Sequence, residues 1–324
     1  MRKLVTLALS LALLIGLGPS ARSADPGLQR VHFLIPAGPG GGWDGTARGV
    51  GLALSQTQSV SSITYENAAG GGGGRAIAKL IETAERQHNT LLISSTPIIV
   101  RALQGVFPQS FRDLVPIAAM IADYSCFAVR ADSNIQDFSD LAQRYKADPK
   151  SIVVAGGSVR GNTDHFVLAK ALQLTGADPK QLVYLAYDGG GKAAAGLLSG
   201  ETQVLSTGLS EALQMHQAGL LRIIAVTAPR PLSQLSDLPL LKSQGVDLVF
   251  ANWRGFFAAK GLPDAQYERM RYTLRTVSES SVFNDIRLRN GWAENHIEGD
   301  AFYSFLERQE DQIRSLMQSI GYLR

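Results

Sequence analysis

The placement of glycine limits the fold of this sequence more than any other feature. Sixteen of its 33 glycines lie in four short segments, at residues 38–45, 70–74, 156–161 and 189–191. Each segment follows an apolar run of strand character and precedes a stretch with helical periodicity. Strands that alternate with helices predict an α/β fold with a largely parallel sheet, whose loops after the strands gather at one edge. We therefore expect each glycine loop to bring its backbone close to something at that edge.

The expected secondary structure repeats this strand–loop–helix unit along most of the chain. Strands are expected at residues 31–35, 62–66, 90–94, 115–121, 125–129, 151–155, 182–186, 202–206, 221–227, 246–250 and 256–259. Helices are expected to begin near Asp44, after the loop at 70–74, at Thr96-Pro97, at Thr163 and after residue 191, and to fill the C-terminal third.

The repeated pattern predicts two α/β lobes. We expect lobe 1 to contain residues 24–124 and 229–324, and lobe 2 to contain residues 125–228, so that the chain crosses between the lobes twice. Three prolines between residues 229 and 239 predict little regular structure where the chain returns. A single, larger α/β domain is the alternative.

The first 23 residues have the pattern of a cleaved secretory signal peptide. Arg2 and Lys3 precede an uncharged apolar run over residues 4–17, and small residues follow at the positions that a signal peptidase reads. The run is shorter than the roughly 20 residues that span a bilayer. Cys126, the only cysteine, is too far away to anchor a lipid at a mature N-terminus. The sequence therefore predicts a soluble, exported protein.

Charge and cysteine content exclude several classes of function. Because Arg2, Lys3 and Arg22 are the only charged residues of the leader, its removal leaves 28 basic and 28 acidic residues. No Lys/Arg-rich run is present, and we expect no nucleic-acid partner. A single cysteine excludes a disulfide scaffold, and the five histidines show no metal-ligand spacing, so no metal or cofactor is expected.

The loops at the predicted sheet edge are suited to a small anion. Helix N-termini carry unpaired N–H groups and a partial positive charge, and glycine lets a ligand approach the backbone without meeting a Cβ. One helix N-terminus contributes about 0.3–1 kcal/mol, whereas micromolar binding needs about 8 kcal/mol. Several loops, charge-assisted hydrogen bonds and the exclusion of water by lobe closure must therefore act together. The predicted ligand is a carboxylate before a phosphate.

Three other motifs point towards enzymes. Residues 40–45 fit G-x-G-x-x-G after a strand, and Glu66 ends the next strand, where a dinucleotide fold holds its ribose-binding acid. An exported, nucleotide-dependent α/β enzyme is therefore the alternative function, although the leader and the other loops argue against it. Residues 189–192 lack the flanking Gly and Ser/Thr of a phosphate loop. Residues 156–158 lack the second glycine of a nucleophile elbow, because Arg160 stands there.

Five motifs together resemble one known family. They are Pro36-Ala37-Gly38-Pro39-Gly40-Gly41-Gly42-Trp43-Asp44 with Ala47-Arg48, Glu66-Asn67-Ala68-Ala69-Gly70-Gly71-Gly72, Gly156-Gly157-Ser158 through Thr163-Asp164-His165, Tyr187-Asp188-Gly189-Gly190-Gly191 with Leu197-Leu198-Ser199-Gly200, and Asn252-Trp253-Arg254-Gly255-Phe256-Phe257-Ala258. Each motif is weak alone, but their order covers nearly the whole mature chain. The sequence resembles the periplasmic solute-binding proteins of tripartite tricarboxylate transporters.

This resemblance implies a two-lobed Venus flytrap, each lobe a mostly parallel sheet flanked by helices, that binds a di- or tricarboxylate and performs no chemistry. It implies delivery of the ligand to a large and a small membrane subunit, and its Gly-Gly-Trp-Asp and Asn-Trp-Arg-Gly forms favour citrate. We expect a monomer; a ligand sensor for a signalling partner would share the same site. The predicted ligand-binding residues are Ala37, Gly38, Gly41, Gly42, Asp44, Ser95, Thr96, Gly157, Ser158, Arg160, Asn162, Thr163, His165, Tyr187, Gly189, Gly190 and Thr207.

Two charged residues among these need separate roles. Asp44 would repel an anion, so we expect it to cap its helix or to pair with Arg48 four residues later. Arg160 stands where relatives carry a small residue, and it either balances an extra ligand carboxylate or is a solvated surface charge. We favour the first role, because backbone donors alone leave a multivalent acid unbalanced.

The remaining roles divide between packing and binding. His165 either caps or packs, or it donates to a bound carboxylate, and the sequence leaves both open. Trp43 and Trp253 are expected to pack rather than to stack on a ligand. The run at residues 70–74 is expected to be a tight turn away from the ligand.

Overall fold

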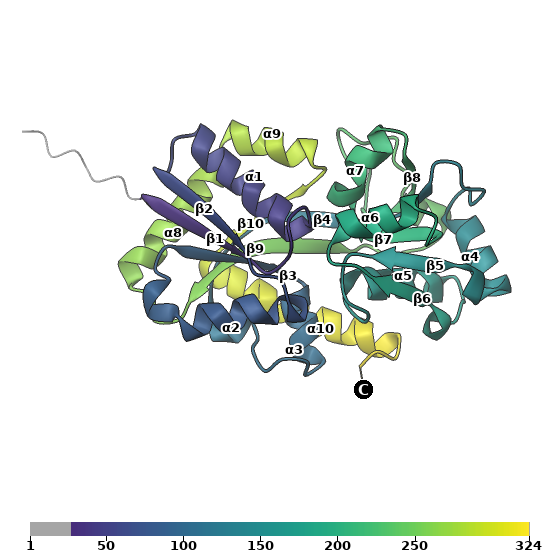
Figure 1. The fold of residues 1–324 in the computed structure, drawn as a ribbon, viewed down its shortest axis with the longest axis horizontal. Coiled ribbons are helices and arrows are strands. Elements are labelled where there is room, and N and C mark those ends of the chain that lie inside the picture. The colour runs from purple at the N-terminus through teal and green to yellow at the C-terminus, as the bar shows by residue number, and fades with distance from the viewer. Residues whose placement is uncertain (1–26, 324) are drawn as a thin grey trace, which may run out of the picture.

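The computed structural model describes residues 27–323, so the leader predicted over residues 1–23 lies outside the described part. Two lobes lie side by side and are joined by long central strands (Figure 1). The strands are β1 (Arg30–Ile35), β2 (Ser62–Asn67), β3 (Thr90–Ser95), β4 (Leu114–Arg130), β5 (Val153–Gly156), β6 (Val183–Ala186), β7 (Val204–Gly208), β8 (Leu221–Val226), β9 (Ala251–Ala259) and β10 (Ala293–Glu298). The helices are α1 (Gly42–Gln56), α2 (Gly74–Glu82), α3 (Pro97–Leu103), α4 (Phe138–Ala147), α5 (Thr163–Leu174), α6 (Gly190–Leu198), α7 (Leu209–Gln217), α8 (Asp264–Ser278), α9 (Ser281–Arg289) and α10 (Gly299–Ser319).

The sheet is mixed, with parallel strands inside each lobe and antiparallel strands where the lobes join. In lobe 1 the order is β2-β1-β3-β9-β4, with β10 also on β4. In lobe 2 the order is β4-β7-β5-β6, with β8 also on β4. The parallel pairs are β1 with β2 and β3, and β5 with β6 and β7. The predicted α/β alternation is therefore present, and antiparallel pairing by β4 and β9 is added to it.

One strand, β4, belongs to both lobes. Its 17 residues replace the two separate strands expected at 115–121 and 125–129. Residues up to Tyr124 pair with β9, and from Ser125 onward the strand pairs with β7. Asp123, which lies between the two expected strands, is fully buried and pairs with Arg254 inside the strand. The lobe boundaries at residues 124/125 and 228/229 remain predictions.

Two further expectations about the C-terminal third were wrong. Residues 246–250 form no strand, and β9 begins at Ala251 instead. A strand, β10, interrupts the segment that was expected to be helical, and it pairs antiparallel with β4. The sequence of β10, Ala-Glu-Asn-His-Ile-Glu, is polar because the strand is only partly buried, and so it lacks the apolar alternation that identifies a strand.

Helices cover both faces of the sheet and bury three apolar clusters. Helices α1, α8 and α9 bury one face of lobe 1 (Figure 1), and α6 and α7 bury one face of lobe 2. The third cluster is continuous through both lobes; Phe166 of α5 packs edge-on against Phe250, and Trp253 packs against Phe302 of α10. Cys126 of β4 is fully buried in the cluster under α6 and α7, and burial raises the pKa of its thiol well above the ordinary value. The lobes thus share one core along the side of α10.

The glycine loops of the two lobes meet between them. A Cβ on Gly41 would lie 3.7 Å from the Cα of Gly189, and a Cβ on Gly157 would lie 2.3 Å from the amide nitrogen of Gly190. Only glycine fits at position 157, because a Cβ there would collide with backbone atoms, which cannot move aside as the end of a flexible side chain could. The loops therefore approach one another at a single crevice, as the alternating pattern predicts.

Candidate functional site

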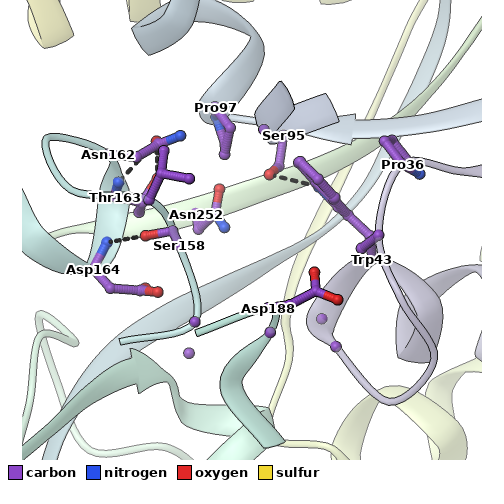
Figure 2. Close-up of a pocket in the computed structure, with 18 of the residues that line it drawn as sticks. Pro36, Trp43, Ser95, Pro97, Ser158, Asn162, Thr163, Asp164, Asp188 and Asn252 are labelled. Atoms are coloured by element: carbon purple, nitrogen blue, oxygen red, sulfur yellow. Dashed lines mark hydrogen bonds between the residues drawn. The ribbon is translucent and has the colours of Figure 1, made fainter. Parts of the chain in front are cut away.

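A cavity of about 380 Å³ lies where these loops meet, and both lobes line it (Figure 2). The predicted residues that line it are Ala37, Gly41, Gly42, Ser95, Gly157, Ser158, Asn162, Thr163, Tyr187 and Gly189. The predicted residues that lie outside the lining are Gly38, Asp44, Thr96, Arg160, His165, Gly190 and Thr207. The predicted glycine loops therefore line the cavity, but Arg160, the predicted ligand cation, is not part of the lining.

Two asparagines in the lining present hydrogen-bond donors. Asn162 is the N-cap of α5, and its Oδ1 accepts from the amide of Thr163 at 2.8 Å and from its hydroxyl at 3.1 Å. The Oδ1 of Asn252, on β9, accepts from the amide of Thr96 at 3.2 Å. Because each carbonyl oxygen is fixed by a backbone N–H, the atom left for a ligand on each side chain is the Nδ2 donor.

Two serines have the same arrangement. The Oγ of Ser95 accepts from the indole nitrogen of Trp43 at 2.8 Å, and the Oγ of Ser158 accepts from the amide of Asp164 at 3.1 Å (Figure 2). The hydroxyl of Ser95 keeps its own proton to donate, whereas the hydroxyl of Ser158 also hydrogen-bonds the side chain of Asp164. Ser95, Asn162 and Asn252, which we name the donor group, therefore line the cavity with an oxygen engaged within the protein and a donor left for a ligand.

Glu211, in the first turn of α7, connects the two lobes across the cavity. Its Oε1 accepts from the amide of Gly42, where α1 begins, at 2.9 Å and from the amide of Gly190, where α6 begins, at 3.0 Å. Its Oε2 accepts from the hydroxyl of Thr207 at 2.9 Å. A carboxylate of the protein itself therefore occupies the anion position that the sequence assigned to a ligand at these two helix N-termini.

Among the described residues that line the cavity, Arg254 carries the single positive charge. Its guanidinium is almost fully buried and donates to Asp123 at 2.7 Å, to the carbonyl of Gly42 at 2.9 Å and to the hydroxyl of Thr46 at 3.0 Å. Asp123 also accepts from the hydroxyl of Ser210 at 2.6 Å. The charge of Arg254 is thus balanced inside the protein, with its Nε left without a partner.

Two further acids complete the lining. Burial raises the pKa of Asp164 to about 7, with a smaller contribution from the charge of Glu211, while hydrogen bonds from Ser158 and Gly157 act in the opposite direction. Asp188 is exposed and pairs with Lys192 at 3.3 Å. We name Asp164, Asp188 and Glu211 the acid group.

Asp44 pairs with Arg48, as predicted. Its carboxylate accepts from the Nε of Arg48 at 2.9 Å, from the amide of Gly40 at 3.0 Å and from Asn67 at 2.9 Å. Burial alone would raise the pKa of Asp44, but these three hydrogen bonds outweigh it and lower that pKa. The side chain organises the loop before α1 and lies outside the cavity lining.

His165 and Arg160 do not reach the cavity. The Nδ1 of His165 accepts from the amide of Gly161 at 2.9 Å, its ring stacks on Tyr322 at 5.0 Å, and burial lowers its pKa to about 4, with Arg160 adding to that shift. The guanidinium of Arg160 donates to the carbonyl of Leu182 at 3.4 Å. This geometry corresponds to the packing role of His165, and the expectation that Arg160 balances a ligand carboxylate is not met.

The cavity includes residues that the sequence placed elsewhere. Gly70, Gly71 and Gly72 line it, so their expected position away from the ligand was wrong. Trp43 also lines it, whereas Trp253 is buried in the core as expected.

Asn252, Arg254 and Glu211 are among the other lining residues that were not predicted. Asn252 and Arg254 alternate on an apolar strand, and this period-two spacing of polar residues is a signal that could have identified them. Glu211 carried no such signal, since an acid in the first turn of a helix is ordinary.

Residues 27–323 contain no helix of the length and hydropathy needed to cross a membrane. In the same part of the chain, no group of three or more His, Cys, Asp or Glu side chains could hold a metal ion.

The fold and the cavity define a two-lobed solute-binding protein. Its architecture is shared with MatC of Rhodopseudomonas palustris with bound malate (TM-score 0.79, 17% identity, 89% of this chain and 98% of that one). It is also shared with an R. palustris protein solved with adipate (TM-score 0.81, 20% identity, 90% and 97%).

Sequence comparison then gives the family. The model of the tripartite tricarboxylate transporter family receptor matches residues 46–322, and the chain belongs to this family of periplasmic receptors. A curated relative, the UPF0065 protein in the tcbD-tcbE intergenic region of Pseudomonas sp. (strain P51), is 28% identical over 246 residues, which cover 74% of this chain and 71% of the relative.

Proposed function

We propose that this protein is a periplasmic receptor that binds a small organic carboxylate in the cavity between its lobes. The observation that carries this proposal is the donor group. Three neutral side chains from both lobes, Ser95, Asn162 and Asn252, have their oxygen atoms engaged within the protein, and they offer N–H and O–H groups to a ligand. A carboxylate accepts hydrogen bonds and donates none, and so it matches this lining.

Two other observations support the same ligand class. The cavity of about 380 Å³ suits a small acid, and its lining includes the start of α5 at Asn162 and Thr163, a helix N-terminus that favours negative charge and that Glu211 does not occupy. Solved relatives with this fold hold malate and adipate, both of which are carboxylates.

The nucleotide-dependent enzyme is less well supported. The amide of Gly42, at the start of α1, would have to hold a pyrophosphate, but it donates to Glu211. In addition, the family consists of receptors rather than enzymes.

We further propose that the protein is exported by the leader at residues 1–23 and acts as a monomer. It would deliver its ligand to a large and a small membrane subunit of a tripartite tricarboxylate transporter. Citrate, the ligand that the sequence favoured, remains one of the acids to be tested.

Isothermal titration of the protein without residues 1–23 tests the binding function. The panel contains citrate, isocitrate, tricarballylate, succinate, adipate, hexanoate and an aromatic acid, with nicotinamide and adenine nucleotides as the competing class. We expect heat and a thermal shift with at least one organic acid and none with nucleotides. Binding of nucleotides alone, or of no acid at all, would contradict the proposal.

A further inference from the structure

The carboxylate of Glu211 already occupies the anion-binding position at the N-termini of α1 and α6. Its carboxylate receives the first amides of α1 and α6, which belong to different lobes, and the hydroxyl of Thr207. These are the groups that a ligand carboxylate would otherwise use at the two glycine loops. A ligand that placed an anion there would have to displace Glu211 or lie against it.

Within the described cavity lining, no free cation offsets this carboxylate. Arg254 is committed to Asp123 at 2.7 Å, and Arg160 lies outside the lining. Lys192 pairs with Asp188 at 3.3 Å, and both side chains are exposed. The acid group therefore leaves this part of the cavity negative, whereas the donor group is neutral.

The size of the cavity brings the two groups within electrostatic reach of any ligand. A volume of about 380 Å³ corresponds to a sphere about 9 Å across, which is close to the screening length of about 8 Å at physiological salt. A ligand whose first carboxylate binds the donor group cannot place a second carboxylate beyond the influence of Glu211. Like charges at this distance in a partly enclosed site strongly disfavour binding.

We propose that Glu211 is a specificity-determining residue that restricts this site to organic acids with a single carboxylate and an uncharged remainder. This inference rests on the proposed carboxylate-binding function and narrows it. The lining fits the uncharged remainder, since Pro36, Trp43, Pro97 and Val159 give the cavity an apolar wall (Figure 2 shows the first three). Tricarboxylates such as citrate are then the most disfavoured acids of the family's range.

Matched pairs of ligands test this inference. Adipate is compared with its monoamide, and terephthalate with 4-carbamoylbenzoate, because each pair differs in one charge at nearly constant shape. Wild-type protein is expected to bind each monoamide about tenfold more tightly than its diacid, or more. Glu211→Gln keeps an oxygen for the amides of Gly42 and Gly190 and removes the charge, and we expect it to reduce the preference to about twofold.

Two variants control this experiment. Glu211→Asp keeps the charge and is expected to retain the preference. Glu307→Gln removes a half-exposed charge on α10 and is expected to behave as wild type. A wild-type protein that binds diacids as tightly as monoamides would overturn the inference while leaving the carboxylate receptor intact.

An unchanged preference in Glu211→Gln would equally overturn it. If that variant does not fold, the wild-type preference decides alone. If no acid in either pair and no acid of the titration panel binds, the inference and the proposed function both end.

Discussion

The donor group and the acid group line the same cavity but are built in opposite ways. In the donor group, backbone amides of the protein donate to the side-chain oxygens of Asn162 and Asn252, so the Nδ2 donors remain for a ligand. In the acid group, the carboxylate of Glu211 accepts hydrogen bonds from the first amides of two helices, so these amides are not free for a ligand and the negative charge of Glu211 remains at the cavity. If the proposed function holds, this cavity would select ligands by the polar atoms that remain free, since the charge of Arg254, the arginine among its described lining residues, is already balanced.

The largest expected effect comes from removing that arginine, which lies in the wall shared by both groups. Arg254→Met leaves Asp123 as a buried carboxylate without its cation, and the free energy of unfolding should fall by about 3–5 kcal/mol. Denaturant titration measures this change. Arg254→Met combined with Asp123→Asn should recover part of the loss, and a decrease below about 1 kcal/mol would contradict a buried pair of this kind.

A second prediction concerns a substitution that replaces a hydrogen-bond donor of the donor group with a negative charge. Asn252→Asp keeps an oxygen for the amide of Thr96 and replaces the Nδ2 donor with negative charge. Affinity for the best organic acid should fall about 100-fold, since a hydrogen bond to a charged group contributes about 1.5–3 kcal/mol and repulsion adds to its loss. Titration calorimetry measures the change, and Asn284→Asp on α9 is the matched control. Equal affinities in both variants would remove Asn252 from the site.

A third prediction uses pH to separate the acid group from its neighbour His165. The pKa of Asp164 is raised to about 7, so its contribution to stability is present below about pH 4 and is lost as the pH rises through 7. The pKa of His165 is lowered to about 4, so its contribution is present above pH 6.5 and is lost as the pH falls through 4. The two opposing trends should give the wild-type protein a shallow pH dependence between pH 4 and 7.

Asp164→Asn removes the pH dependence of stability that comes from Asp164 and leaves the one that comes from His165. The charges that face Asp164 are those of Glu211 and Arg254, and Arg160 faces His165. The variant should gain stability over wild type as the pH rises from about 4 to 7, at about 1.4 kcal/mol for each pH unit over which folded Asp164 keeps a proton that the unfolded chain has lost, and the difference should level off above pH 7. Thermal melts across this range check it. A constant difference between the two proteins would mean that Asp164 does not titrate there.

The smallest expected effect concerns Arg160. Because its guanidinium contacts the carbonyl of Leu182 rather than the cavity, Arg160→Ala should change affinity for citrate and for succinate by no more than about twofold. A selective loss of citrate binding would restore Arg160 as a ligand cation and would weaken the contrast between the two groups.

The features that the sequence predicted are those set by local pattern. The glycine loops, the α/β alternation, the start of α5 at Thr163 and the Asp44–Arg48 pair all follow from spacing within a few residues. Each of these features could be predicted from the sequence because its physical cause lies within one turn of helix or one loop.

The features that were missed depend on contacts between distant segments. Glu211 contacts an amide 169 residues away, and Arg254 contacts an acid 131 residues away. Strand β10 has no apolar alternation of its own and is fixed by pairing with β4. Arg160 was assigned to the ligand from charge balance, but it contacts the carbonyl of Leu182, and the arginine in the lining, Arg254, is balanced by Asp123, to which no local pattern connects it.

The burial of Cys126 has a practical consequence for studying how the lobes move. It is the only cysteine in the chain, and a fully buried thiol with a raised pKa reacts slowly with maleimides or disulfide reagents. The natural protein therefore already serves as a background for site-directed labelling. One cysteine introduced on the surface of each lobe would carry one dye of a fluorophore pair, and energy transfer between the dyes would report any opening of the cleft without removal of the native cysteine.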